Sequence, residues 1–233
     1  MRILSIIWIS ILFSVVSCTP EINFDEPQPA GDKNENTFRK KFQGIYFCKD
    51  DSSMLTIDEN KIIQEWHLII EVPKEELDTT EGVEIRDGKI YSKDIPEPLP
   101  FQMSGDTVII NWDFELTIFK ISPDQILRYY NGFYFLNYKK PDNLWVIKVL
   151  SIDSKGLLTL NKLQGGSQQI EEIKQITHVD NVLDDEGKVV THKIHPTRRE
   201  LREILRSDMF VSGSEFKKIK LLNENNLNEN KRM

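Results

Sequence analysis

The chain has 233 residues, of which 39% are hydrophobic and 29% are charged, a composition typical of a folded protein and unlike that of a disordered one. Its formal net charge is −7, and loss of Arg2 with a cleaved leader makes it one unit more negative. This sign disfavours nucleic acid as a partner, because phosphate binding needs a basic stripe. The densest basic cluster, residues 198–206, is interrupted by Glu200 and Glu203.

The first 17 residues have the pattern of a secretory leader. A positive start at Arg2 precedes an apolar run over residues 3–16 that only three serines, Ser5, Ser10 and Ser14, interrupt. The run is shorter than the roughly 20 apolar residues that cross a bilayer as a helix, and Pro20 with polar residues follows it. We therefore expect a cleaved signal peptide at residues 1–17 rather than a permanent transmembrane helix.

Residues 15–18, Val-Val-Ser-Cys, resemble the lipobox of bacterial lipoproteins: a branched apolar residue, a tolerant position, a small residue and then cysteine. The resemblance implies cleavage between Ser17 and Cys18, and lipid attachment to the Cys18 thiol, the nucleophile that takes up lipid. The implied two or three acyl chains anchor a protein firmly, since each buried CH₂ contributes about 0.8 kcal/mol. Thr19 stands where an aspartate retains some Gram-negative lipoproteins at the inner membrane. The resemblance thus implies the cell envelope and the outer membrane, at either face.

Both ends of the mature chain are polar and lack an apolar period. The segment after the cysteine holds Pro20, Pro27 and Pro29 among charged residues, and it predicts a flexible, lipidated tether over residues 18–37. The Asn- and Glu-rich residues 223–233 predict a disordered tail.

Between these ends, residues 38–222 are predicted to form one β-rich globular domain. Short runs rich in Ile, Val, Phe, Tyr and Trp alternate with turn residues, which is typical of antiparallel strands. The predicted strands are residues 44–49, 54–58, 61–72, 107–112, 115–121, 132–138, 144–153 and 157–162.

Two stretches of this domain look alike. Gly-Ile-Tyr-Phe at 44–47 and Gly-Phe-Tyr-Phe at 132–135 each lead into a hairpin of the same design. The likeness predicts two similar halves, about 38–123 and 124–222, whose antiparallel meanders pack as a sandwich or close into a lipocalin-like barrel. A chance likeness between common hairpin patterns is the alternative.

The last third of the chain adds short helices that pack on the sheet. Thr197 and Glu200 form a capping box, which predicts a helix over residues 198–206 with one apolar stripe. The other predicted elements are a helix over 168–175, a hairpin across 184–187 and a final strand over 215–222.

The sequence carries no recognisable catalytic or cofactor motif. It has no Gly-Xaa-Ser-Xaa-Gly elbow, phosphate-binding glycine-rich loop or dinucleotide fingerprint. Cys48 lies in an apolar run with no histidine close in sequence, so we expect a buried, inert thiol. Acidic pairs such as Asp184 and Asp185 are expected to be solvated. We predict no cofactor and no enzymatic activity.

The histidines give little support for a metal site. His192 and His195 are three apart on a predicted strand and therefore point to opposite faces. His178 and His195 fall diagonally on one face if Leu183 opposes Lys188 in the hairpin. Two ligands do not make a site, so no metal ligand is predicted.

One short segment is crowded with aromatic residues. They are Tyr129, Tyr130, Phe133, Tyr134, Phe135 and Tyr138. Because six rings exceed what one buried face can hold, some are expected to line a groove or a barrel mouth.

Together these features favour a non-catalytic, lipid-anchored envelope protein that acts in binding or in assembly at the outer membrane, with an envelope protein as partner. The alternative is a lipocalin-like carrier of a small apolar ligand, which a cavity of roughly several hundred Å³ favours and a filled interior excludes. A cell-wall or glycan hydrolase is a third and weaker alternative. The mature part resembles the uncharacterised lipoproteins of Gram-negative envelopes, a likeness that implies no site residues.

Overall fold

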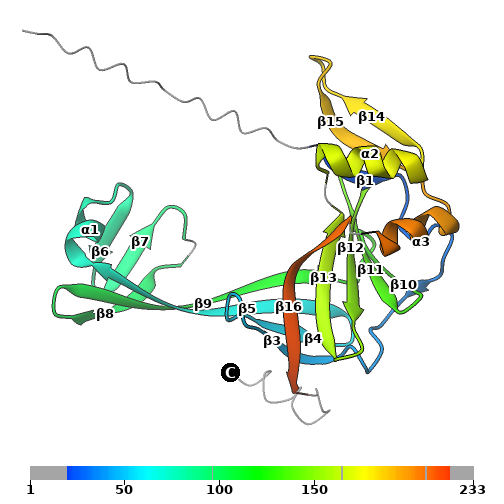
Figure 1. The fold of residues 1–233 in the computed structure, drawn as a ribbon. Coiled ribbons are helices and arrows are strands. Elements are labelled where there is room, and N and C mark those ends of the chain that lie inside the picture. Colours follow the sequence, from blue (N-terminus) through cyan, green and yellow to red (C-terminus); the bar gives the residue numbers. More distant parts are fainter. Residues whose placement is uncertain (1–19, 96, 164, 208, 221–233) are drawn as a thin grey trace, which may run out of the picture.

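The computed structural model describes residues 20–220 apart from residues 96, 164 and 208. The predicted leader, the lipobox residues Ser17 and Cys18, and the predicted tail at 223–233 therefore lie outside the described residues. The described chain is mainly β, and its antiparallel sheet does not close on itself, so the predicted fold class is confirmed. Figure 1 shows a body from which two long strands extend as an arm.

The described residues form sixteen strands and three helices. The strands are β1 (Glu21–Phe24), β2 (Asn34–Glu35), β3 (Gly44–Cys48), β4 (Met54–Ile57), β5 (Lys61–Pro73), β6 (Val83–Arg86), β7 (Lys89–Ser92), β8 (Leu99–Ser104), β9 (Thr107–Lys120), β10 (Gln125–Tyr130), β11 (Phe133–Lys139), β12 (Trp145–Ile152), β13 (Leu157–Leu163), β14 (Val179–Leu183), β15 (Val189–Ile194) and β16 (Phe210–Lys220). The helices are α1 (Lys74–Thr79), α2 (Ser167–Ile176) and α3 (Arg198–Arg206).

The body is built on two meanders that the last strand joins. Strands β3, β4 and β5 form one meander and β11, β12 and β13 form the other, while β16 pairs with both β13 and β3. The two look-alike stretches of the sequence begin these two meanders. The larger core, which both meanders line, consists of Phe38, Phe42, Tyr46, Cys48, Leu55, Ile57, Ile62, Phe119, Leu127, Tyr134, Leu136, Leu150, Leu158 and Phe216.

A second core lies on the other side of β12. Because successive side chains of a strand point to opposite faces, Leu150 joins the larger core while Val149 packs with β1 and the helices α2 and α3. The crowded aromatic residues divide in the same way: Tyr134 is buried in the larger core and Phe135 in the second. Two buried faces therefore account for the six rings, and the expected groove is not needed to explain them.

Residues 20–37 do not form the predicted flexible tether. Strand β1 pairs in parallel with β15 and buries Ile22 and Phe24 in the second core. The proline-rich stretch after it is fixed by Asn137, whose side chain accepts the Gln28 N–H at 2.6 Å and donates to the Gln28 carbonyl at 3.0 Å. A four-residue strand is too short to show an apolar period, which is why the sequence predicts a linker here.

The predicted C-terminal helices are confirmed. Helix α3 begins at the predicted capping box: the Thr197 hydroxyl accepts the Glu200 N–H, and the Glu200 carboxylate accepts the Thr197 N–H at 2.8 Å. Helix α2 buries Ile170 and Ile173, as an amphipathic helix on a core does. Of the helices in the described chain, none is both long and apolar enough to cross a bilayer.

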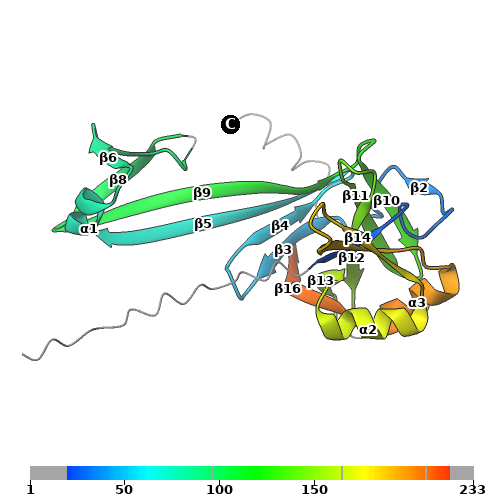
Figure 2. The same ribbon diagram turned by 90° about the horizontal axis from the view of Figure 1, so that it is seen from above.

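One expectation within the sheet is wrong. The predicted strands at 107–112 and 115–121 are a single strand, β9, in which apolar and polar residues alternate without a break from Ile110 to Ile118. The small unit formed by α1, β6, β7 and β8 at the far end of the arm has no counterpart among the sequence predictions. Figure 2 shows this distal unit separated from the body by the β5–β9 pair.

Candidate functional site

The arm is a two-stranded ribbon with open edges. Strands β5 and β9 pair from Lys61 with Lys120 to Pro73 with Thr107, a length of about 40–45 Å at the usual rise of a strand. Strand β4 pairs with β5 only as far as Glu65, and β8 pairs with β9 only over residues 107–110. Between these limits no third strand of the described chain pairs with either edge.

One side of this open stretch is apolar and partly exposed. It carries five large side chains, which we call the aromatic face: Trp66, Leu68, Trp112, Phe114 and Leu116. The Trp66 and Trp112 rings lie 5.4 and 5.8 Å from the Phe114 ring, centroid to centroid. Phe114 and Leu116 are 41% and 45% exposed, whereas most side chains of this size are buried in a monomer.

The aromatic face lies between two covered stretches of the same ribbon side. Towards the body, Ile62 and Phe119 are fully buried in the larger core. Towards the tip, Val108 and Ile110 are buried in a small third core with Ile90 of the distal unit. The arm is thus packed at both ends, whereas in its middle Phe114 and Leu116 are exposed and Trp112 packs partly against the third core.

A β-bulge sets this arrangement. The register of β5 and β9 shifts between Ile62 and Ile63, so one extra residue of β9 is accommodated there. Without the bulge, the period of two would place Phe119 and Phe114 on opposite faces. With it, the buried face of the body continues into the aromatic face of the arm.

The other side of the arm is acidic. It bears Glu65, Glu71, Asp113 and Glu115, with His67 paired to Asp113. Glu65 lies directly opposite Glu115. Partial burial, and then repulsion by the Glu115 carboxylate, raise the pKa of Glu65 above its usual value.

Polar contacts fix the root of the arm. The Trp66 indole N–H donates to the Asp51 carboxylate at 3.1 Å, and the Gln64 amide donates to the Ser53 hydroxyl at 2.8 Å. Burial raises the pKa of Asp51, but hydrogen bonds from Ser53 and Trp66 among others outweigh it, so this pKa lies below its usual value. The first ring of the aromatic face is therefore held to the β3–β4 turn by a charged acceptor.

The interior of the body is filled by side chains. The Tyr134 ring lies 4.8 Å from the Phe42 ring and 5.1 Å from the Phe38 ring, and all three side chains are almost fully buried. A half-open cavity of about 220 Å³ lies at the edge of this core, lined by Lys148 and Lys162 among others. Such packing disfavours the lipocalin-like carrier, and we do not propose it.

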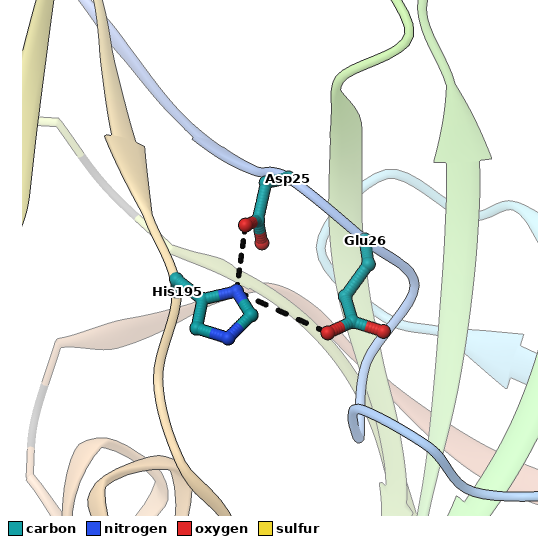
Figure 3. A group of neighbouring side chains, drawn as sticks. All are labelled: Asp25, Glu26 and His195. Carbon is teal, nitrogen blue, oxygen red and sulfur yellow. Dashed lines mark hydrogen bonds and ion pairs between the residues drawn. The ribbon is translucent and has the colours of Figure 1, made fainter.

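Asp25, Glu26 and His195 form a cluster where β1 and β15 end (Figure 3). The two strands are parallel and pair Phe24 with Ile194, so the residues that follow emerge side by side. The His195 Nδ1 atom lies 2.6 Å from an Asp25 carboxylate oxygen and 3.9 Å from a Glu26 oxygen.

These three donors could hold a divalent cation with water completing its coordination, but they are one fewer than structural zinc sites use. Asp25 and His195 already satisfy each other, and both are exposed. We interpret the cluster as a hydrogen-bonded contact between the ends of β1 and β15. His178 contacts Asp180 instead, at 2.9 Å.

The hairpin register differs from the one that the sequence analysis considered. Leu183 opposes Val189 after a bulge, not Lys188. His178 and His195 contact different carboxylates, those of Asp180 and Asp25, and His192 pairs with Asn181 at 2.8 Å. Among the described residues, the only metal-like grouping of three includes neither His178 nor His192.

The other residues singled out in the sequence have structural roles. Cys48 is fully buried in the larger core, as expected. Asp184 accepts the backbone N–H groups of Glu186 and Lys188 in the exposed hairpin turn. The aromatic face was missed, because its residues alternate like those of any half-buried strand. No pattern in the sequence shows that this face lacks a covering element, because alternation is the same in covered and uncovered strands.

Comparisons of the chain with protein-family models, with curated proteins and with solved structures find no match.

Proposed function

We propose that this protein is a non-catalytic, lipid-anchored envelope protein that binds an extended segment of a partner protein along the open middle of its arm. The observation that carries the proposal is the aromatic face, a row of large side chains between two packed ends of one ribbon, in which Phe114 and Leu116 are exposed and the other three are half-buried. Aromatic side chains supply much of the energy of protein interfaces when a partner desolvates them.

The open edges favour a strand as the occupant. Along the middle of β9, backbone N–H and C=O groups have no third strand to pair with in the described chain. A partner strand added at this edge satisfies those groups, while its alternate side chains contact Phe114 and Leu116. Backbone pairing then contributes affinity, and the aromatic face contributes specificity.

Two other occupants fit less well. A bilayer interior does not accept a ribbon with open edges, because unpaired backbone groups are not satisfied in hydrocarbon. A second copy added edge to edge aligns two acidic faces, with Asp113 and Glu115 of one copy near the same residues of the other. Charge complementarity instead favours a partner whose apolar segment is flanked by lysine or arginine.

The proposed lipid on Cys18 places the body next to the membrane. Only Thr19 and Pro20 separate Cys18 from β1, so the chain reaches at most about 11 Å from the lipidated residue to Glu21. In this arrangement the arm, which is about 40–45 Å long, and not a flexible tether, allows the protein to contact a partner away from the membrane. The resemblance to the lipobox supports the anchor and the outer membrane.

The anchor is tested by labelling cells with radioactive palmitate. The wild-type product should carry the label and fractionate with membranes, whereas Cys18→Ala should do neither. A matched control is Cys48→Ala, which removes the other cysteine and should leave labelling unchanged. Unlabelled wild-type protein, or a labelled Cys18→Ala variant, contradicts the anchor.

Binding by the arm is tested with a photo-reactive amino acid placed at Phe114 or, as a control, at Ile69. Ile69 lies on the other side of the same ribbon and is more exposed, at 62%. In intact cells, one discrete protein adduct should form from position 114 and not from 69. The adduct is identified by mass spectrometry, and the purified partner should bind Leu116→Ser at least tenfold more weakly than wild type. Equal adducts from both positions, or unchanged affinity, contradict the proposal.

A further inference from the structure

The half-open cavity of the body lies where the inner faces of four strands meet. Its volume is about 220 Å³. Its lining residues come from β5, β12, β13 and β16: Gln64, Lys148, Leu160, Lys162, Val211, Gly213, Ser214 and Phe216. Leu160 and Phe216 also contact the larger core, so the cavity lies at the edge of that core, where the sheet does not close, and we call this place the mouth of the open barrel. Barrel mouths are common places for small-ligand sites.

Two lysines face each other in this mouth. Lys148 and Lys162 are direct cross-strand neighbours on β12 and β13. Like charges placed opposite each other destabilise a sheet. Burial lowers the pKa of the Lys148 amine below its usual value, and the Lys162 charge lowers it further.

Within the part of the chain that the structure describes, no acidic group compensates these two charges. None of the lining residues is acidic, and no carboxylate of the described residues forms an ion pair with either lysine. The contact described for the Lys148 amine is the Tyr138 ring, whose centroid is 5.4 Å away. This is notable in a chain with 37 acidic and 30 basic residues. A half-buried, uncompensated cation is costly for folding, and an anionic ligand removes that cost.

The rest of the wall is mostly apolar. Its apolar lining residues are Leu160, Val211 and Phe216. Gln64 lines the cavity from β5, near the point where this strand extends into the arm. The volume is below the roughly 300–1,000 Å³ of drug-sized sites. The ligand that matches this wall has an anionic group and a short apolar body.

We propose that the mouth of the open barrel is a binding site for a small amphiphilic anion, held by Lys148 and Lys162 at its charged end and by Leu160, Val211 and Phe216 along its apolar part. The charged end is a carboxylate or a phosphate monoester, which present the same chemistry to two amines. The site is separate from the aromatic face and does not depend on the arm binding a partner.

The test is calorimetric titration of the chain from Cys18 to Met233, made without lipid so that no detergent competes. The probes are octanoate, octyl phosphate, inorganic phosphate and 1-octanol. Octanoate or octyl phosphate should bind at one site, and whichever binds more tightly identifies the anionic group. Inorganic phosphate and 1-octanol should bind at least tenfold more weakly, because each lacks one half of the ligand.

Lys148→Met and Lys162→Met keep the length of the side chain and remove its charge. Each should weaken binding of the preferred probe at least tenfold, while Lys155→Met, in an exposed turn, should not change it. Ligand-free Lys148→Met should melt about 2–4 °C higher than wild type, because an uncompensated charge is gone. Adducts from position 114 should be unchanged in this variant.

Several results overturn the proposal. They are no binding of either amphiphilic anion, equal binding of 1-octanol, and unchanged affinity in Lys148→Met. A Lys148→Met variant that melts lower and still binds shows that the lysine has only a packing role.

Discussion

Two phenylalanines of strand β9 differ sharply in how far their side chains are covered. Phe119 and Phe114 lie on the same side of β9, five residues apart, with one bulge between them. Phe119 is fully buried in the body, while Phe114 is 41% exposed on the arm. The same residue type on one strand thus contributes to the core at one end and is partly exposed to solvent at the other. Apolar patterning identifies the buried side of a strand, but it does not say what covers that side.

The largest difference in stability is expected between the alanine variants of these two phenylalanines. Phe119→Ala should lower the free energy of unfolding by about 3–5 kcal/mol, because it leaves a cavity in the larger core. Phe114→Ala should lower it by less than about 1 kcal/mol, since much of its side chain is already in water. Urea denaturation of both variants measures the difference. Similar losses mean that the arm is packed as tightly as the body.

The next largest effect is expected where β1 joins the body. A Cβ at Gly165 would overlap the Pro20 carbonyl oxygen, whereas a Cβ at Gly166 meets only the flexible end of the Gln169 side chain. Gly165→Ala should therefore cost about 1–3 kcal/mol, and Gly166→Ala less than about 1 kcal/mol. Thermal melting compares them. Equal stability of Gly165→Ala and wild type means that residues 20–24 are a loose tether after all.

A smaller effect on stability is expected at the beginning of helix α3. Thr197→Ala removes the N-cap of α3 and should cost about 1 kcal/mol. In the distal unit, the Thr79 hydroxyl of α1 donates only to carbonyls within its own helix, so Thr79→Ala should change stability by less than about 0.5 kcal/mol. Circular dichroism during urea titration gives both values. A larger loss from Thr79→Ala means that this hydroxyl contributes more than its contacts within α1 account for.

The smallest effect is expected on the acidic side of the arm. The pKa of Glu65 is raised in the folded protein, so its charged form is less favourable there than in the unfolded chain. Glu65 therefore contributes fully to the free energy of unfolding below the ordinary glutamate pKa of about 4.3. This contribution is lost as the pH rises through the raised pKa. Glu65→Gln should therefore stabilise the protein at pH 7 by about a few tenths of a kcal/mol and have no such effect at pH 4. A stabilisation that is equal at both pH values excludes charge repulsion as its cause.

The sequence predicts the elements whose signals are local. The capping box at Thr197 and Glu200 places α3 at its observed bounds, and the alternating runs place β3, β4, β12 and β13 within a residue or two. It does not predict that β16 joins the two meanders, because strand pairing over long separations has no local signature.

The errors concern segments whose structure depends on distant contacts. β1 is held by its pairing with β15, some 170 residues later in the chain. In the predictions from sequence, residues of the aromatic face are distributed over three separate strands, at 61–72, 107–112 and 115–121, and alternation alone does not show whether a ribbon is covered. The two lysines of the barrel mouth are remote in sequence from Gln64 and Phe216, so only the fold brings the cavity together.

The central claim is that a partner covers the aromatic face in the cell, and cysteine accessibility tests it most directly. Native Cys48 is fully buried and should not react, so single cysteines at Leu116→Cys and Ile69→Cys report on the two sides of the arm. Maleimide labelling of Leu116→Cys should be at least tenfold slower in intact envelopes than in the purified protein, while Ile69→Cys should label at a similar rate in both. Equal rates for Leu116→Cys in envelopes and in solution would contradict the account.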